Sequence, residues 1–380
     1  MIAALSDVCL VGHPFAPIGM GEQLRSSFRA LRSVGVRPAL LDVYGSNQPE
    51  PAAESEFGPF LEKGFRTLNL FHINGDEIEP VLAHLAGRPS PPKMWRAVSP
   101  LWELPNYPSQ WAQLLDQFDE VWASSRFIEQ ALVKVVHRPI VHMSPACEVV
   151  LSSFLGRRFF GIPESAYAFL FSFDLRSWVT RKNPEAVVAA FRLTVHRRPH
   201  ALATLVLKIN GAELGDDRYR AFLESIADLR DHVLVLPRTL TDDEMKNLVR
   251  CCDCYVSLHR SEGFGRGPAE AMALGKPVIA TRWSGNLDFM NNGNSLLVDC
   301  ELTPVPPNAY PHWQGQHWAD PDVEQAAASM VELLDEPEKG VAIGRRASFD
   351  MRRDFSYRAI GVRTVQQMEE AMRRATSGGH

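Results

Sequence analysis

Two glutamates in the segment 257–281 have a spacing that suits the recognition of hydroxyl groups. Glu262 and Glu270 are separated by seven residues. A carboxylate accepts two hydrogen bonds at once, which fits the vicinal hydroxyls of a sugar or a ribose. Glycines between them let the loop backbone approach a ligand closely, and these are Gly263, Gly265 and Gly267. The alternative is that Glu270 only favours a helix start and that Glu262 is a surface charge.

The elements around this loop are predicted to be a strand, a helix and a second strand. Residues 254–258 form a short apolar run that suits a buried strand. Pro268 suits the first position of a helix, Gly275 suits its end, and Val278 begins the next strand. Glu270 is therefore expected in the first helical turn. The N-terminus of this helix favours an anion such as phosphate, because its N–H groups lack intrahelical partners.

A second candidate anion site lies earlier in the chain. Residues 174–182 are predicted to be a loop, Asn183 an N-cap and Pro184 the first residue of a helix. Arg181 and Lys182 therefore come just before a helix N-terminus, where cations and backbone N–H groups converge on an anion. The alternative is that both are solvated charges at a helix start.

The segment 257–281 resembles the donor-site motif of family 4 of the retaining glycosyltransferases, in a bacterial branch that builds envelope glycans and includes mannosyltransferases. Residues 283–290, 294–298 and 181–184 resemble the same family. The resemblance implies that Glu270 holds the ribose of a nucleotide sugar and that Glu262 contacts hydroxyls of the transferred sugar. It also implies that Arg181 and Lys182 bind the diphosphate, with Gly263, Phe264 and Gly265 against the donor.

The first part of the chain is expected to contribute fewer residues. A loop that ends with Gly19 and Gly21 follows the strand expected at residues 8–11, and in the family such a loop meets the donor phosphate and the acceptor. Many members place a histidine near the reacting sugar, at the end of a strand that we expect over residues 94–104. This chain has Trp102 and Glu103 there, so Glu103 is the candidate that orients the acceptor hydroxyl, with His72 as a weaker one.

Strands and helices alternate throughout, which predicts an α/β protein with two parallel, doubly wound domains. The resemblance implies the GT-B fold, in which two Rossmann-like domains face each other across a cleft. We expect an acceptor-side domain over residues 1–155 and a nucleotide-sugar-binding domain over residues 156–356. A last helix, residues 357–376, is expected to cross back onto the first domain.

Composition excludes several other classes of protein. Hydrophobic residues make up 45% of the chain and charged residues 22%, which is typical of globular rather than disordered proteins. A net charge of −5 does not suit a nucleic-acid binder. The sequence contains no run of 18 apolar residues, so we expect no membrane-spanning helix. We also expect no signal peptide. Six scattered cysteines suit a reducing compartment, so the expected location is cytoplasmic.

Three arginines form a stripe on the first expected helix, namely Arg25, Arg29 and Arg32. Such a stripe is usually a solvated face, and less often it binds anionic lipid. It is the basis for a candidate peripheral contact with the inner face of the membrane. The cysteine-rich segment 251–254 lacks the spacing of a zinc knuckle, and its cysteines are expected to be buried as small hydrophobic residues.

The resulting hypothesis is a retaining, metal-independent hexosyltransferase without a cofactor, which uses a nucleotide sugar and a glycan or lipid-linked acceptor. The branch favours GDP-mannose as the donor, with UDP- and dTDP-sugars as alternatives. Three other functions remain: a nucleotide-sugar epimerase, a non-catalytic sugar-nucleotide-binding subunit and a dinucleotide-dependent dehydrogenase. The glycine spacing G-x-G-x-G, followed by a short helix, argues against the dehydrogenase.

Overall fold

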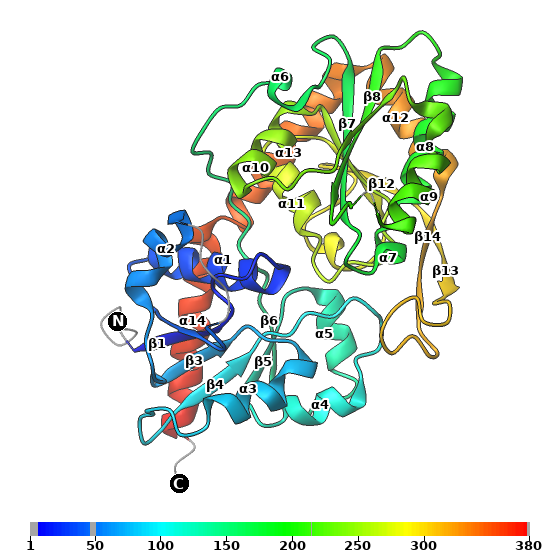
Figure 1. Ribbon diagram of the computed structural model, residues 1–380. Coiled ribbons are helices and arrows are strands. Elements are labelled where there is room, and N and C mark those ends of the chain that lie inside the picture. Colours follow the sequence, from blue (N-terminus) through cyan, green and yellow to red (C-terminus); the bar gives the residue numbers. More distant parts are fainter. Residues whose placement is uncertain (1–6, 46–50, 214, 378–380) are drawn as a thin grey trace. The chain divides into compact units, whose positions relative to one another are not determined.

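The computed structural model describes residues 7–45, 51–213 and 215–377, and the chain divides into two compact units (Figure 1). Unit 1 comprises residues 1–147 and 353–380, and unit 2 comprises residues 148–352. The sequence placed these two boundaries at residues 155 and 356.

Unit 1 is built on a sheet of six parallel strands in the order β2-β1-β3-β4-β5-β6. The strands are β1 (Val8–Gly12), β2 (Ala39–Asp42), β3 (Leu68–Phe71), β4 (Trp95–Val98), β5 (Glu120–Ala123) and β6 (Ile140–His142). The chain leaves β1 for β2 on one side and later returns beside β1 with β3. Strand order therefore reverses between β1 and β3, which makes their carboxyl ends a topological switch point.

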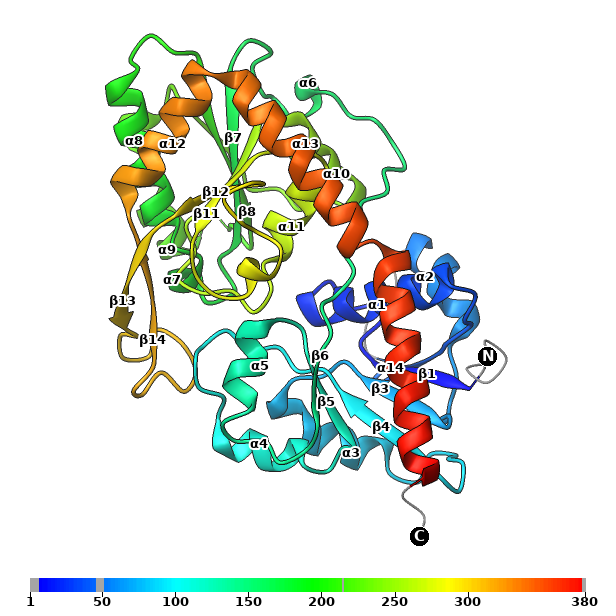
Figure 2. The same ribbon diagram turned by 180° about the vertical axis from the view of Figure 1, so that it is seen from behind.

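Helices cover both faces of this sheet. They are α1 (Gly19–Ser33), α2 (Pro51–Phe57), α3 (Ile78–Leu85), α4 (Ser109–Leu115), α5 (Arg126–Leu132) and α14 (Tyr357–Ser377). Leu24 and Phe28 of α1 pack with Met368 of α14 against the sheet in one buried core. Figures 1 and 2 show α14 behind the strands and α3 and α4 in front of them. The last helix of the chain is therefore an integral part of unit 1.

Unit 2 contains a second sheet of six parallel strands, in the order β12-β11-β10-β7-β8-β9. The strands are β7 (Tyr167–Asp174), β8 (Ala203–Asn210), β9 (Val233–Leu236), β10 (Cys254–Ser257), β11 (Val278–Thr281) and β12 (Leu296–Val298). Because β8 and β9 extend the sheet on one side of β7 and β10 to β12 on the other, the switch point lies between β7 and β10.

The sheet of unit 2 is covered on both faces as well. The helices are α6 (Arg157–Phe160), α7 (Val179–Lys182), α8 (Pro184–Arg197), α9 (Asp217–Ser225), α10 (Asp242–Cys251), α11 (Arg266–Ala273), α12 (Val323–Asp335) and α13 (Pro337–Asp354). Phe169, Phe171 and Phe173 alternate along β7 and pack toward α8 and α12. Helices α10, α11 and α13 lie on the opposite face (Figures 1 and 2). The spacing of Thr241 and Glu244 predicts a capping box at a helix start, and the structure confirms that this capping box opens α10.

Several expected loops contain regular structure. The polar, proline-containing segment 46–57 predicts a loop, but its residues 51–57 form α2, since Ala52, Ala53 and two glutamates are strong helix formers; residues 46–50 lie outside the described residues. The segment 301–318 is rich in proline and aromatic residues, which predicts an ordered loop, but it belongs largely to an antiparallel hairpin of β13 (Cys300–Pro304) and β14 (His317–Pro321). Among the described residues there are also four short 3₁₀ helices, namely Gly58–Phe60, Gly75–Glu77, Ala227–Leu229 and Gly285–Asp288.

Two expected boundaries are wrong. The types of Asp320 and Pro321 predict an N-cap and a first helical residue, but both residues belong to β14, so helix α12 begins at Val323 and is capped by the side chain of Asp322. Strand β4 ends at Val98, whereas the sequence extended it to residue 104; Pro100 cannot donate to a strand ladder, which explains the early end.

The cysteines of segment 251–254 are buried and none forms a disulfide, as expected. None of the helices in the described part of the chain has the length and apolar character to cross a membrane.

Candidate functional site

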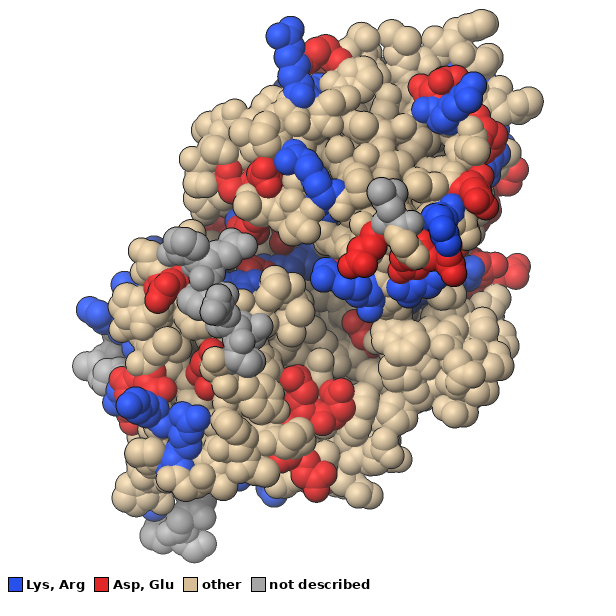
Figure 3. All heavy atoms as spheres, viewed as in Figure 1, with Lys and Arg blue, Asp and Glu red and all other residues tan. Residues whose placement is uncertain are grey.

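The motif residues of unit 2 meet at its topological switch point. Helix α7 follows β7, the loop of residues 258–265 follows β10, and these two strands are neighbours in the sheet. Ligands of doubly wound sheets bind outside the carboxyl ends of the strands at such a point. Figure 3 shows charged side chains of both signs gathered along the margin of unit 2 near α7. The fold therefore brings both sequence motifs to one place.

Glu262 is buried there between the two predicted cations. Its Oε2 lies 3.2 Å from Nη1 of Arg181, and its Oε1 accepts a hydrogen bond from Nζ of Lys182. Burial alone would raise the pKa of Glu262, but the charges of Lys182 and Arg181 overcome that effect and lower it to about 2. Glu262 is therefore an ionised carboxylate at neutral pH, and it is not the solvated surface charge considered as an alternative.

Helix α7 fixes Arg181 and Lys182, although the sequence predicted a loop over residues 174–182. Arg181 is buried, and its Nη1 donates to the carbonyl of Ser261 at 2.8 Å. The N–H of Arg260 donates back to the carbonyl of Arg181 at 2.8 Å. These two hydrogen bonds attach the chain after β7 to the chain after β10.

Asn183 connects α7 to α8 in a way that the sequence predicted only in part. It occupies the N-cap position of α8, as expected, but its side chain makes no capping hydrogen bond. Its Nδ2 donates instead to the carbonyl of Leu258 at 2.9 Å. Its backbone has a φ of 58°, a left-handed conformation that asparagine tolerates better than most residues. Asn183 is thus a third link between α7 and the loop after β10.

The loop of residues 258–265, called the glycine loop below, is hydrogen-bonded to the segment that follows β11. The N–H of Glu262 donates to Oγ of Ser284 at 2.8 Å, and the N–H of Gly285 donates to the carbonyl of Glu262 at 2.9 Å. A Cβ on Gly285 would lie 2.0 Å from the carbonyl oxygen of Gly263, so only glycine fits there. Gly265, the N-cap of α11, has a φ of +94°, which also requires glycine.

Phe264 and Glu270 complete the predicted group in unit 2. Phe264 is buried, and its ring centroid lies 5.0 Å from that of Phe289. Glu270 is partly exposed on α11, and its Oε1 lies 3.1 Å from Nε of Arg266. The expected position of Glu270 in the first turn is wrong. Helix α11 begins at Arg266, two residues before Pro268, which puts Glu270 in the second turn.

His259 and Asn286 also support this loop, and the sequence did not single them out. His259 is fully buried, and its Nδ1 lies 2.9 Å from Oγ of Ser257. Its Nε2 lies 3.1 Å from Oδ1 of Asn286, whose Nδ2 donates to the carbonyl of Thr281 at 3.0 Å. Burial lowers the pKa of His259, which favours the neutral ring. The only sequence signal was that His259 lies within the segment 257–281 and Asn286 within the segment 283–290, both of which resemble the family.

The predicted site residues of unit 1 lie in two places. Gly19 and Gly21 lie near the switch point between β1 and β3, and Glu103 lies in the loop after β4. Gly19 and Gly21 belong to the first turn of α1, not to the loop before it. A Cβ on Gly21 would lie 2.4 Å from the carbonyl oxygen of Ala16, so glycine lets that loop fold back on the helix. Glu103 is partly exposed.

Two histidines of unit 1 follow the strands of that switch point. His72 comes directly after β3 and is 2% exposed, and no described residue hydrogen-bonds to either ring nitrogen. Burial lowers the pKa of His72 to about 3. His13, which sequence reasoning did not single out, follows β1, and its Nε2 lies 2.9 Å from Oε1 of Glu77. His72 is therefore a neutral core residue, whereas His13 has a carboxylate partner.

The arginine stripe on α1 is engaged within unit 1. Nε of Arg25 donates to Glu22 at 2.8 Å, and Arg29 makes two hydrogen bonds of 2.8 Å with Glu56. The guanidinium of Arg32 lies 5.1 Å from the ring centroid of Phe60. Two of the three charges are thus neutralised by carboxylates.

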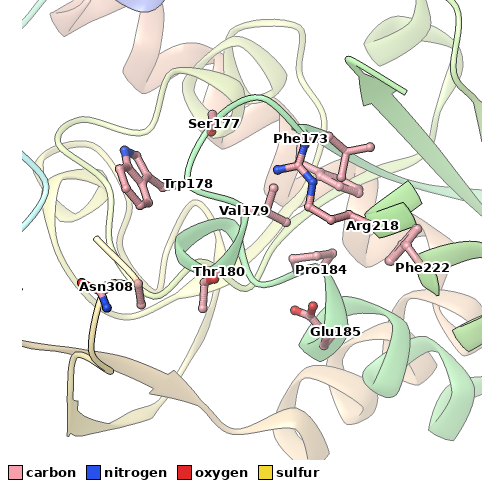
Figure 4. A pocket seen from close by; sticks show the side chains of 12 residues that line it. Phe173, Ser177, Trp178, Val179, Thr180, Pro184, Glu185, Arg218, Phe222 and Asn308 are labelled. Atoms are coloured by element: carbon pink, nitrogen blue, oxygen red, sulfur yellow. The ribbon is translucent and has the colours of Figure 1, made fainter. Parts of the chain in front are cut away.

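A separate pocket of about 360 Å³ adjoins α7 in unit 2. Figure 4 shows Trp178 and Asn308 on one side of it and Arg218 and Phe222 on the other. The ring of Trp178 lies 5.7 Å from that of Tyr310, which in turn lies 6.0 Å from the guanidinium of Arg181. The hairpin loop that carries Tyr310 therefore reaches the predicted phosphate-binding group. Within residues 7–45, 51–213 and 215–377, no group of three or more His, Cys, Asp or Glu side chains is placed to hold a metal ion.

Comparison with known proteins identifies relatives of this chain. Residues 157–348 match the family model of the group 1 glycosyl transferases. The chain is 25% identical over 275 residues to a D-inositol 3-phosphate glycosyltransferase of Thermobispora bispora, which covers 69% of this chain and 58% of the relative. It is 24% identical over 203 residues to a GDP-mannose-dependent monoacylated alpha-(1-6)-phosphatidylinositol monomannoside mannosyltransferase of Corynebacterium glutamicum, which covers 51% and 46%. The chain thus spans less than two thirds of either relative.

Solved structures show the same fold over nearly the whole chain. HepE of Anabaena, in complex with UDP and glucose, has a TM-score of 0.70 at 14% identity, with 96% of this chain and 100% of that chain covered. Sucrose-phosphate synthase of Thermosynechococcus elongatus has a TM-score of 0.67 at 16% identity, with 96% and 98% covered. This likeness confirms the predicted fold class, the GT-B fold with two Rossmann-like units.

Proposed function

The chain belongs to the group 1 family of glycosyl transferases, and on this premise we propose that it moves a hexose from a nucleoside diphosphate sugar to a hydroxyl group with retention of the anomeric configuration. The observation that carries the proposal is the meeting of Arg181 and Lys182 with Glu262 beside the glycine loop at the switch point of unit 2. Two cations against one carboxylate leave one net positive charge. The N-terminus of α11 adds a partial positive charge, so the site attracts an anion.

The diphosphate of the donor binds Arg181 and Lys182, and this binding changes the state of Glu262. As the phosphate oxygens take over the two cations, the Glu262 carboxylate becomes available to accept hydrogen bonds from hydroxyls of the transferred sugar. Glu270 accepts hydrogen bonds from the ribose hydroxyls. Gly263, Phe264 and Gly265 place the loop backbone against the donor. The roles expected of Gly19, Gly21 and Glu103 stay predictions.

The chemical step uses electrostatic stabilisation rather than a protein nucleophile. Arg181 and Lys182 neutralise the negative charge that develops on the leaving diphosphate. The acceptor hydroxyl attacks from the face that the diphosphate leaves, and a phosphate oxygen takes its proton. No divalent metal and no cofactor take part in this proposal, which assigns the reaction to family 4 of the retaining glycosyltransferases.

As the donor we propose GDP-mannose, on the ground that one 24% identical relative carries a GDP-mannose-dependent activity in its name. UDP- and dTDP-sugars are the alternatives. The acceptor is a hydroxyl of a glycan or of a lipid-linked glycan, and the location is the cytoplasm, where nucleotide sugars are made. Peripheral contact with the inner membrane face is the least supported part, because Arg25 and Arg29 are paired with carboxylates.

A turnover assay with a panel of donors tests this proposal. The protein is incubated with GDP-mannose, UDP-glucose and dTDP-glucose, each with glycan and lipid-linked acceptors, and the release of nucleoside diphosphate is measured with and without EDTA. One donor should be consumed only with an acceptor, EDTA should have no effect, and NMR of the product should show the anomeric configuration of the donor. Glu262→Gln should retain nucleoside diphosphate binding and lose transfer. An inverted product, or turnover that depends on magnesium, contradicts the proposal.

The same assay separates the remaining alternatives. An epimerase would convert a nucleotide sugar into its epimer without an acceptor. A non-catalytic binding subunit would bind the donor and transfer nothing to any acceptor. A dehydrogenase does not fit a chain that belongs to the glycosyl transferases.

A further inference from the structure

Lys208 is a buried lysine at the carboxyl edge of the sheet in unit 2. It is 1% exposed on β8. Its neighbours in register are Ser172 of β7 and Leu236, the last residue of β9. The ammonium group therefore lies at the level where the sheet ends and where a ligand of the switch point would begin.

Lys208 lies on the same face of the sheet as α11. The opposite face carries Leu205, Leu207 and Ile209, which pack in the core with α8 and α12. Because side chains alternate along a strand, Lys208 shares its face with Ser172 and Asp174 of β7. On that face, Oγ of Ser172 lies 2.7 Å from the hydroxyl of Tyr255, which in turn lies 2.5 Å from where a Cβ on Gly267 of α11 would be.

The charge of Lys208 has little compensation in the described part of the chain. Its Nζ donates to Oδ1 of Asn210, and no carboxylate among the described residues forms an ion pair with it. Asp174 is near enough to act on its charge, although the carboxylate itself is hydrogen-bonded to Arg176. Burial lowers the pKa of Lys208 to about 8, while the charge of Asp174 opposes this shift. Lysines are rarely this buried without an ion pair, so the position calls for a functional explanation.

The distance from the phosphate-binding group suits a nucleotide. Glu262 and its cations follow β10 and β7, and β8 is the second strand from β10. Adjacent strands are about 4.8 Å apart, so β8 lies roughly 10 Å from β10. A nucleoside diphosphate with its phosphates at Arg181 and Lys182 and its ribose at Glu270 extends its base over a distance of this order, toward the end of β8.

We propose that Lys208 and Asp174 read the nucleobase of the donor, with Lys208 donating to a ring keto oxygen and Asp174 accepting from the adjacent ring N–H. The inference rests on the proposed function, and it adds the class of base that the site accepts. A lysine ammonium is only a donor and an ionised aspartate is only an acceptor. Guanine and uracil present a keto oxygen beside a ring N–H, whereas adenine and cytosine present an amino group beside an unprotonated ring nitrogen. The pair therefore selects guanine, uracil or thymine, which has the same edge as uracil, and rejects adenine and cytosine.

Calorimetric titration with four nucleoside diphosphates tests this inference. The full chain should bind GDP more tightly than ADP, or UDP more tightly than CDP, by roughly 10-fold to 100-fold, the discrimination typical of a paired base contact. Comparing the affinity for GDP with the affinity for UDP shows which of the two bases the donor carries. Lys208→Met should remove the preference, and Asp174→Asn should reduce it. The matched control is Lys339→Met, an exposed lysine at the start of α13, which should leave it unchanged.

The outcomes separate this inference from the proposed function. Lys182→Met should weaken binding of all four nucleotides by a similar factor, because it acts on the diphosphate. If binding depends on Lys182 while ADP and CDP bind as tightly as GDP and UDP, the base-reading inference is wrong and the proposed function stands. If none of the four binds and dTDP does not bind either, both are wrong. Melting curves show whether Lys208→Met folds; if it does not, the partly exposed Asp174→Asn decides the question alone.

Discussion

At the residue scale, the account depends on one carboxylate shared by two cations. Glu262 would be costly to bury alone, because an isolated buried charge loses its hydration. Arg181 and Lys182 offset that cost, and the pKa of Glu262 falls to about 2 although burial opposes the shift. The same two cations are the proposed partners of the diphosphate. In the proposed function, the donor diphosphate replaces this internal anion at the two cations.

This ion pairing predicts a dependence of stability on acid. The pKa of Glu262 is about 2 in the folded protein and close to its usual value of 4.5 when unfolded. The unfolded state therefore binds more protons between these values, so the contribution of Glu262 is complete above about pH 4.5 and is lost as the pH falls toward 2. Melting temperatures measured at pH 5 and pH 3 should drop less for Glu262→Gln than for the wild type. An equal drop contradicts the assignment.

The sequence predicted the chemical residues of unit 2 better than those that support them. Glu262 was expected at the hydroxyls of the transferred sugar and Arg181 and Lys182 at the diphosphate of the same donor, and the structure brings the three together. His259 and Asn286 were missed because their role comes from contacts between the loops after β10 and β11, which no local pattern encodes. Lys208 was missed because a single lysine inside an apolar strand has no motif around it.

At the element scale, the glycine loop depends on the segment after β11. Ser284 and Gly285 hydrogen-bond to the backbone of Glu262 on both sides, and Gly285 approaches Gly263 too closely for any side chain. Helix α11 can begin at Gly265 because that residue adopts a left-handed backbone. Loop and helix are therefore positioned by packing against residues about 20 positions later in the sequence.

Gly285→Ala tests this dependence. The added methyl would lie 2.0 Å from the carbonyl oxygen of Gly263, so the loop must move. Overpacking of this kind costs roughly 1–3 kcal/mol, and the shift should also weaken nucleoside diphosphate binding in a calorimetric titration. Gly293→Ala is the matched control, because the nearest atom to its added Cβ would be a side-chain oxygen of Asn291 in an exposed turn. Unchanged nucleotide affinity in Gly285→Ala would show that the close approach does not position the site.

The elements themselves were largely predictable where periodicity and caps agree. Both sheets, helix α8 after Asn183-Pro184 and the capping box of α10 follow from local patterns. The elements that the sequence did not predict depend on tertiary contacts, which local patterns do not encode. Helix α7 is stabilised by its bonds to the loop after β10, the 301–318 hairpin by pairing of β13 with β14, and the early start of α11 by Gly265.

At the scale of the whole molecule, both units have a parallel sheet with one reversal of strand order, and the motif residues follow these reversals. In unit 2 the reversal lies between β7 and β10, and the residues proposed to bind the diphosphate, the transferred sugar and the ribose belong to segments that follow one of these strands. In unit 1 it lies between β1 and β3, where His13, His72 and the start of α1 are found. The central claim is therefore that a nucleoside diphosphate binds at the β7–β10 edge of unit 2.

Hydrogen–deuterium exchange over the full chain tests that claim most directly. Exchange is measured by mass spectrometry with and without GDP or UDP, whichever binds more tightly, at a concentration that saturates the protein. The account predicts slower exchange in residues 179–184, which contain Arg181 and Lys182, and in residues 258–270, which contain the glycine loop and Glu270. If the nucleotide binds and exchange in residues 258–270 does not change, the donor site lies elsewhere and the account is wrong.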